Sequence, residues 1–180
     1  MSKKSTQVAL GGLASALCLL LMFMTGMIPF ATYALPAAAG IVLIAVVREN
    51  GRKAATLVYT TVSLLSIFVV PDREAALLFI FFFGYYPILK GIMERIHFKP
   101  VVLVLKFLLF NVAVVAAYWV IVNVLGIPDI MESFGDFGKY SALVILGMGN
   151  VVFAVYDFAL SNLVWAYENW FRPKVLRKMK

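Results

Sequence analysis

The sequence has few of the residues on which most enzyme and metal sites depend. It contains one cysteine, Cys18, and one histidine, His97, among 180 residues. A single cysteine excludes an intrachain disulfide and any multi-cysteine metal site. Glycine-rich phosphate loops, His-Glu metal motifs and the GxSxG motif are also absent from the sequence. We therefore expect a protein that is not an enzyme, that holds no metal or cofactor, and that cannot power transport by itself.

Charged residues are also scarce. They make up 14% of the chain, against 63% hydrophobic residues, whereas soluble domains carry about 25% charged residues. A water-soluble domain of 20.0 kDa with a mean hydropathy of +0.96 could not bury this much apolar surface, so the sequence predicts a protein embedded in lipid. The net charge of +7 comes from basic residues between hydrophobic runs and at the chain ends. This distribution indicates membrane loops rather than a nucleic-acid partner.

The apolar runs predict an all-α membrane bundle of six transmembrane helices in one domain, residues 1–180. The expected spans are residues 8–28, 31–47, 54–70, 75–93, 101–125 and 140–167. Most are close to the roughly 20 residues that cross bilayer hydrocarbon. A cleaved signal peptide is the alternative for the first run, because a basic start precedes it. Its removal would still leave five spans.

The basic residues predict how this bundle is oriented. Both termini and the loops after spans two and four share one side. That side collects Lys3, Lys4, Arg48, Arg52, Lys53, Lys90, Arg95, Lys99, Arg172, Lys174, Arg177, Lys178 and Lys180. The opposite side collects Arg73 and Lys139. Cytoplasmic loops are rich in lysine and arginine, so we expect both termini in the cytoplasm and the chain in a bacterial plasma membrane.

The fourth span carries an unusual polar step. Its apolar and aromatic run is interrupted by Tyr85, Tyr86 and Pro87. Proline removes a helical hydrogen bond and frees backbone carbonyls, which neighbouring polar side chains must satisfy in a membrane. We expect a kink or a helix-packing joint at this step.

One acidic residue, Asp157, lies inside a predicted span. A buried charge in a membrane indicates a functional site or a paired partner. By depth, Lys106 in span five is the expected partner of Asp157, with Lys90 nearby. The pair has two interpretations, a structural ion pair that fixes the packing of spans four to six and a proton relay.

Polar and aromatic residues toward the outer side are candidates for substrate binding. These are Tyr33, Asp72, Glu74, Trp119, Asn123, Asp136 and Asn150. Solvated loop acids, hydrogen bonding between helices and packing of Trp119 against lipid or other helices explain the same residues without a ligand.

Small residues form a stripe on span one. Ala9, Gly12 and Ala16 recur at helical spacing, and small residues let another helix approach closely in lipid. The stripe fits either packing within this protein or docking of a separate subunit.

These features together resemble the substrate-binding S component of energy-coupling factor transporters. They are the length of the chain, six spans, the small-residue start ALGGLASAL, the break MIPFATYALP and the basic loop after span two. The resemblance implies that a small metabolite or vitamin binds at the outer face, near the loops after spans one, three and five. It also implies a transmembrane coupling subunit, docked on Ala9, Gly12 and Ala16, and ATPase subunits as partners.

Two other functions fit the sequence. One is a non-transporting envelope scaffold, similar to the rod-shape protein family, which docks other membrane proteins through span one. The other is a membrane enzyme that acts on lipid.

Overall fold

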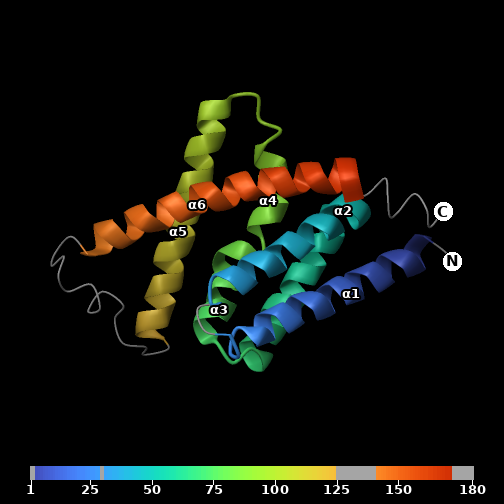
Figure 1. Ribbon diagram of the computed structural model, residues 1–180, viewed down its shortest axis with the longest axis horizontal. Coiled ribbons are helices and arrows are strands. Elements are labelled where there is room, and N and C mark those ends of the chain that lie inside the picture. The colour runs from blue at the N-terminus through green and yellow to red at the C-terminus, as the bar shows by residue number, and fades with distance from the viewer. Residues whose placement is uncertain (1–2, 29–30, 125–140, 172–180) are drawn as a thin grey trace. The chain divides into compact units, whose positions relative to one another are not determined.

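The computed structural model of the chain describes residues 3–28, 31–124 and 141–171 (Figure 1). All regular structure within these ranges is helical, which confirms the predicted all-α class. The helices are α1 (Lys3–Met24), α2 (Ala34–Val69), α3 (Arg73–Leu78), α4 (Tyr86–Met93), α5 (Lys99–Asn123) and α6 (Ser141–Ala166), with π-helical segments η1 (Phe79–Phe83) and η3 (Tyr167–Phe171). Elements α1 to α5 form one compact unit, and α6 with η3 forms a second.

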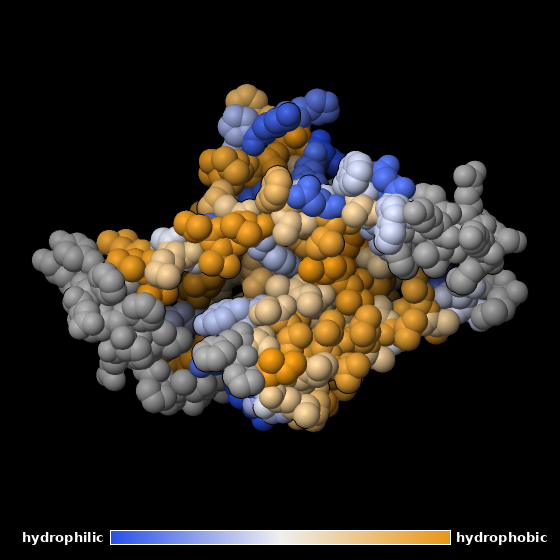
Figure 2. Space-filling model, viewed as in Figure 1, coloured by the Kyte–Doolittle hydropathy of each residue, from blue (hydrophilic) through white to orange (hydrophobic). Residues whose placement is uncertain are grey.

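Five helical segments in the described residues are long and apolar enough to cross a membrane. They are Ser5–Met24, Ala34–Val69, Arg73–Met93, Lys99–Asn123 and Leu143–Trp170. Many of their large apolar side chains are exposed, and hydrophobic residues cover most of the surface over α1 (Figure 2). A helix with this much exposed apolar surface needs lipid around it. The chain is therefore a multi-pass membrane protein by architecture.

Helix α2 contains the turn that the sequence predicts between spans two and three. We expected spans at 31–47 and 54–70 with a glycine-containing loop between them, and the structure narrows that loop to one residue, Gly51, at which α2 reverses. Gly51 has φ 82° and ψ 173° inside α2, a conformation that is essentially restricted to glycine. Figure 1 shows the two halves of α2, light blue and teal, running side by side from the point where they meet.

A hydrogen bond between the flanks of α2 follows from this reversal. The Thr32 hydroxyl, just before α2, donates to Asp72 Oδ2, just after it, at 2.8 Å. A straight helix of 36 residues would separate these groups by about 54 Å. Gly51 therefore folds α2 into a helical hairpin.

The core of the first unit lies where α1 packs on this hairpin. One face of α1 is buried at Ala14, Cys18 and Met22, which are spaced four residues apart and so lie on one side of the helix. The Cys18 thiol donates to the Ala39 carbonyl at 3.4 Å. Cys18 is thus a packing residue between α1 and α2. The remaining core residues from α2 are Ala39, Leu43, Val46, Ala55, Val58 and Val62.

The first unit has two ends. We call them the Gly51 end and the Asp72 end, each after a residue that lies there. At the Gly51 end, Asn50 Nδ2 donates to the Gln7 carbonyl at 2.9 Å, and Arg52 Nη2 donates to the Gly91 carbonyl at 3.3 Å. These bonds bring together the start of α1, the α2 reversal and the end of α4. At the Asp72 end, the turn after α1 meets the turn after α2.

The hairpin makes a prediction about Gly51. Replacing Gly51 with alanine should lower the free energy of unfolding by about 1–3 kcal/mol, because a Cβ strains the backbone at this positive φ. Titration with sodium dodecyl sulfate in mixed micelles, followed by circular dichroism, measures the change. Gly91→Ala on α4 is the control, since open space surrounds a Cβ there and alanine favours the helix. Equal losses in the two variants would contradict the assignment of strain to Gly51.

Candidate functional site

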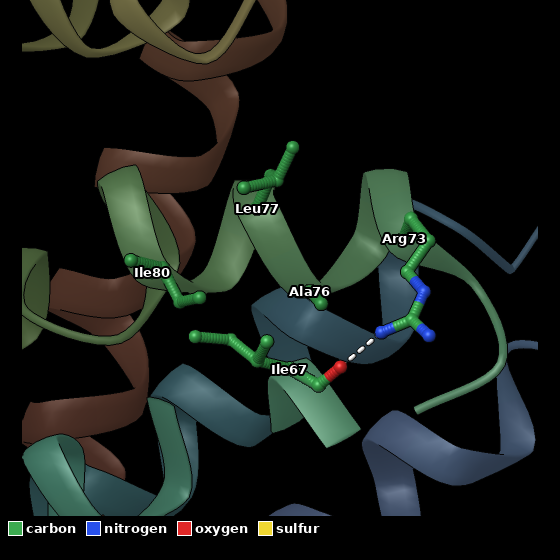
Figure 3. A pocket seen from close by; sticks show the side chains of 5 residues that line it. All are labelled: Ile67, Arg73, Ala76, Leu77 and Ile80. Carbon is green, nitrogen blue, oxygen red and sulfur yellow. Dashed lines mark hydrogen bonds between the residues drawn. The ribbon is translucent and has the colours of Figure 1, made fainter. Parts of the chain in front are cut away.

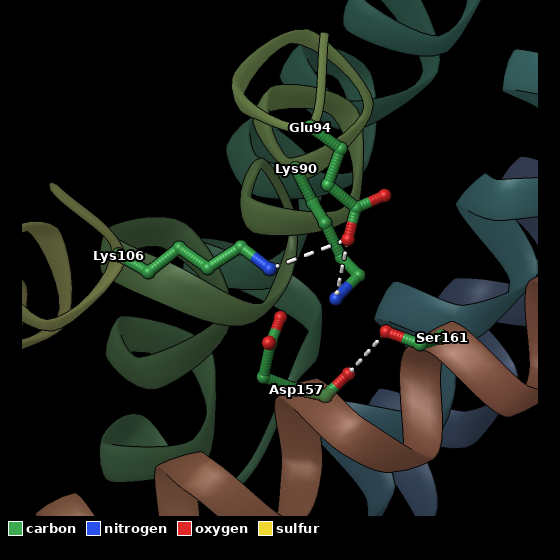
Figure 4. A network of polar contacts seen from close by, with 5 residues as sticks. All are labelled: Lys90, Glu94, Lys106, Asp157 and Ser161. Atoms are coloured by element: carbon green, nitrogen blue, oxygen red, sulfur yellow. Dashed lines mark hydrogen bonds and ion pairs between the residues drawn. The ribbon is translucent and has the colours of Figure 1, made fainter. Parts of the chain in front are cut away.

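The most unusual polar feature of the first unit is a pair of buried lysines that share one carboxylate. Lys90 lies on α4 and Lys106 on α5, and they are 3% and 7% exposed. Both ammonium groups converge on Glu94 Oε1, at 3.0 Å from Lys90 and 3.2 Å from Lys106 (Figure 4). Glu94 directly follows α4, and its side chain is 44% exposed. We call these three residues the lysine network.

The lysine network joins α4 to α5 at the Gly51 end. Lys90 and Glu94 are four residues apart, so the helical turn brings them onto the same face. Lys106 then reaches the same oxygen from the neighbouring helix. Burying an ammonium group is costly unless a carboxylate accepts its hydrogen bonds. Glu94 therefore holds α4 against α5, and its negative charge offsets the positive charge of the buried lysines.

The sequence hypothesis for Lys106 missed Glu94 as a partner. Glu94 is one residue beyond the expected span 75–93, where a solvated charge is the ordinary expectation. The signal that could have found it is the four-residue spacing from Lys90. Asp157 lies on α6 in the second unit, where the Ser161 hydroxyl donates to its backbone carbonyl at 3.0 Å (Figure 4). The pairing of Lys106 with Asp157 stays a prediction.

The predicted break in span four is present, and it begins earlier than expected. Residues of η1 form a π-helical turn, with the Gly84 amide donating to the Phe79 carbonyl at 2.8 Å. The Tyr59 hydroxyl of α2 donates to the Ile80 carbonyl at 2.7 Å. A tyrosine from another helix thus satisfies part of the disturbed backbone, as a lipid environment requires.

Packing around this break leaves no room for a side chain at Gly84. A Cβ there would lie 2.6 Å from Cδ2 of Tyr59 and 2.9 Å from Cε1 of Phe79. Tyr86 is fully buried and stacks on Phe82 at 4.8 Å between ring centroids. The Tyr-Tyr-Pro step is therefore part of a helix-packing joint, which is one of the two roles expected from the sequence.

At the Asp72 end, two of the predicted substrate residues have different surroundings. Asp72 caps α3, with Oδ1 accepting from the Ala75 amide at 3.0 Å while Oδ2 accepts from Thr32. Glu74 is half-buried, and no hydrogen bond or ion pair engages its carboxylate within the described residues. Asp72 is thus committed to holding the turn, while the Glu74 carboxylate is available for another group.

Tyr33 lies close to these two acids. Partial burial raises the pKa of the Tyr33 phenol, and the carboxylates of Glu74 and Asp72 raise that pKa further. The protonated phenol can donate a hydrogen bond. The structure brings together three of the seven predicted substrate residues, Tyr33, Asp72 and Glu74.

A small cavity lies beside this end of the unit, between the end of α2 and α3. Its volume is about 130 Å³, and it is lined by Ile67, Arg73, Ala76, Leu77 and Ile80 (Figure 3). Arg73 closes one side, where its guanidinium donates to the Ile67 carbonyl. Pockets for small metabolites are usually about 300–1,000 Å³. The cavity is too small for such a ligand, and none of the predicted substrate residues lines it.

Within the described residues of the first unit, no hydrogen bond or ion pair joins Trp119 or Asn123 to this group. Trp119 and Asn123 are exposed on the last turns of α5, and Asn123 Nδ2 donates to the Trp119 carbonyl at 2.9 Å. Asn150 Nδ2 on α6 donates to the Leu146 carbonyl at 2.7 Å. Both amides thus bond to the helix that carries them. Asp136 lies outside the described residues.

The small-residue stripe of α1 lies on the side opposite the core. Ala9, Gly12 and Ala16 are exposed, and a Cβ added at Gly12 would have no neighbour within 4 Å. A Cβ added at Gly11, one position earlier, would instead lie 3.7 Å from Cγ2 of Val58. Among the described residues of the first unit, the stripe is therefore an open surface and not part of the α1–α2 packing.

No group of three or more potential metal ligands occurs in the described ranges. Comparison of the chain with family models, curated proteins and solved structures finds no match.

The lysine network predicts a loss of stability when its carboxylate is neutralised. Glu94→Gln should lower the free energy of unfolding by about 1–3 kcal/mol, because two buried ammonium groups lose a charged acceptor. Detergent unfolding followed by circular dichroism measures the change. Glu74→Gln is the matched control and should leave stability nearly unchanged, since Glu74 holds no ion pair in the described structure. A loss in Glu94→Gln no larger than in the control would refute the role of Glu94.

Proposed function

We propose that the chain is the substrate-binding component of a membrane importer of the energy-coupling factor type, located in the bacterial cell membrane. It binds a small metabolite or vitamin at its outer face, and a transmembrane coupling subunit with ATPase subunits drives the import. The observation that carries this proposal is the open stripe of Ala9, Gly12 and Ala16. Small residues that pack against nothing in their own unit leave a surface onto which a partner helix fits closely.

The arrangement of the helices supports the topology of such a component. Each half of α2 is long enough to cross the bilayer, since 17 or 18 helical residues reach about 26 Å. With the halves counted separately, the five apolar segments supply six crossings, and both termini then lie on the side of the Gly51 end. Basic residues gather at that end, namely Arg48, Arg52, Lys53, Lys90, Arg95, Lys99 and Lys106. The positive-inside rule then makes the Gly51 end cytoplasmic.

The Asp72 end would face outward and bind the substrate. Two loops meet there, because a Cβ at Gly26 would lie 2.8 Å from Pro71. Tyr33 offers a hydrogen-bond donor and Glu74 a carboxylate that is not otherwise engaged. These two residues are the substrate contacts that we propose, while Asp72 holds the loops in place.

An envelope scaffold is the second candidate function. The same open stripe on α1 would dock a structural membrane protein, and a scaffold needs no ligand at the Asp72 end. The two functions differ in which partners they recruit and in whether a small molecule binds.

Gentle purification of the full chain from its native membrane separates these functions. We expect ATPase subunits to purify with the chain, and mass spectrometry to find a small molecule that leaves on denaturation. Isothermal titration of the identified molecule should then show weaker binding to Glu74→Gln than to the native chain. Recovery of envelope-assembly proteins with no bound small molecule would instead support the scaffold.

The stripe on α1 predicts the effect of a bulky substitution. Gly12→Leu should reduce recovery of the partner by about tenfold, because the added side chain keeps the partner helix from approaching closely. The variant should unfold like the native chain, since no atom lies within 4 Å of a Cβ at Gly12. Gly147→Leu on α6 is the matched control, because its Cβ also enters open space. Undiminished recovery with Gly12→Leu would exclude the stripe as the docking surface.

A further inference from the structure

The Gly51 end of the first unit carries an exposed basic surface. Arg52 and Lys53 come from the α2 reversal, and Arg95 and Lys99 come from the corner between α4 and α5. Hydrophilic residues are seen over this corner at the top of Figure 2. The hydrogen bond from Arg52 to the Gly91 carbonyl ties the α2 reversal to α4. Basic residues from two separate turns therefore lie at one end of the unit.

The acid nearest to this corner does not neutralise its surface. Glu94 Oε1 is engaged by Lys90 and Lys106, which lie inside the unit. No ion pair joins Lys53, Arg95 or Lys99 to an acid within the described residues. The charges of Arg95 and Lys99 therefore remain available to a negatively charged group outside the protein.

Apolar side chains alternate with these charges. The corner reads Arg95, Ile96, His97, Phe98 and Lys99, and Phe98 is 63% exposed and Ile96 41% exposed. In water, two exposed apolar side chains between basic residues would be unfavourable. At a membrane interface, the same pattern places apolar groups among acyl chains while basic groups meet phosphates.

The opposite end of the unit does not repeat this pattern. Arg73 is the basic residue at the Asp72 end within the described ranges, and its guanidinium turns to the Ile67 carbonyl. The two ends of the unit differ in how many basic residues they carry and in whether the charged groups of those residues are engaged by the protein. One end offers exposed cations beside exposed apolar side chains, and the other uses its arginine to cap α2.

We propose that the corner between α4 and α5 binds an anionic phospholipid, with Arg95 and Lys99 on the headgroup phosphate and Ile96 and Phe98 among the acyl chains. Arg52 and Lys53 add attraction from the α2 reversal. The occupant is a lipid because basic and apolar groups alternate within five residues of a membrane protein. The inference rests on the membrane class alone, so it does not depend on the transport proposal.

Native mass spectrometry of the full chain tests this proposal. The purified protein is mixed with equal amounts of phosphatidylglycerol, which is anionic, and phosphatidylcholine, which is zwitterionic. We expect the native chain to retain phosphatidylglycerol preferentially. The double variant Arg95→Gln, Lys99→Gln should weaken that preference by about 25-fold, at roughly fivefold for each charge removed. Added glycerol phosphate should not displace the lipid, since it lacks acyl chains.

Two controls keep the outcome interpretable. Arg73→Gln removes one charge at the opposite end and should leave the lipid preference unchanged. Phe98→Ser should weaken retention of both lipids to a similar extent, since it removes an apolar contact and no charge. Equal retention of the two lipids by the native chain overturns the proposal. It is also overturned if the double variant, folded by circular dichroism, keeps the native preference.

Discussion

The structure depends on one constraint, that backbone polar groups inside a lipid solvent must be satisfied by the protein itself. Polar side chains within the apolar helices face the same constraint and meet it locally. Serine, threonine and asparagine side chains donate to carbonyls three or four residues earlier in their own helix, as at Ser15, Thr25, Thr56, Thr60, Ser66, Asn111, Asn123, Asn150 and Ser161.

The polar contacts that join helices have a large influence on how the first unit is arranged. Tyr59 bonds to the disturbed backbone of span four, Arg52 holds the α2 reversal to α4, and Glu94 links α4 to α5. Apolar packing between helices is weakly directional in lipid, because lipid tails are as apolar as the side chains. These three contacts supply the direction that such packing lacks.

The sequence predicted the helices better than it predicted their interruptions. Each apolar run is long enough to predict a helix, and the six expected ranges agree with helical segments of the structure to within about five residues. The charged residues around Gly51 predict a loop with its turn at that glycine, and the structure confines the loop to Gly51, since those residues continue the helix on both sides. Nothing in the run FIFFF predicts a π-helical turn, since that turn arises from packing against Tyr59 and from the lack of a side chain at Gly84.

The candidate sites were predicted in part for a similar reason. Residue type and depth indicated that Lys106 needed an acidic partner, but the choice of Glu94 depends on where α4 ends. Tyr33, Asp72 and Glu74 lie near one another, as expected of loops on the same side of a membrane bundle, while their role in substrate binding stays a prediction. Thr32 bonds to Asp72, whereas the Glu74 carboxylate has no such partner within the described residues. This difference depends on side-chain geometry, which cannot be read from the sequence.

The reversal at Gly51 also has a consequence for biosynthesis. A turn made by one residue leaves no length of chain between the two halves of α2, so the halves cannot move apart at their shared tip. They therefore form one paired unit, whose tip carries Arg48, Arg52 and Lys53. Moving these three charges through hydrocarbon is unfavourable, so we expect the pair to enter a bilayer with its tip trailing.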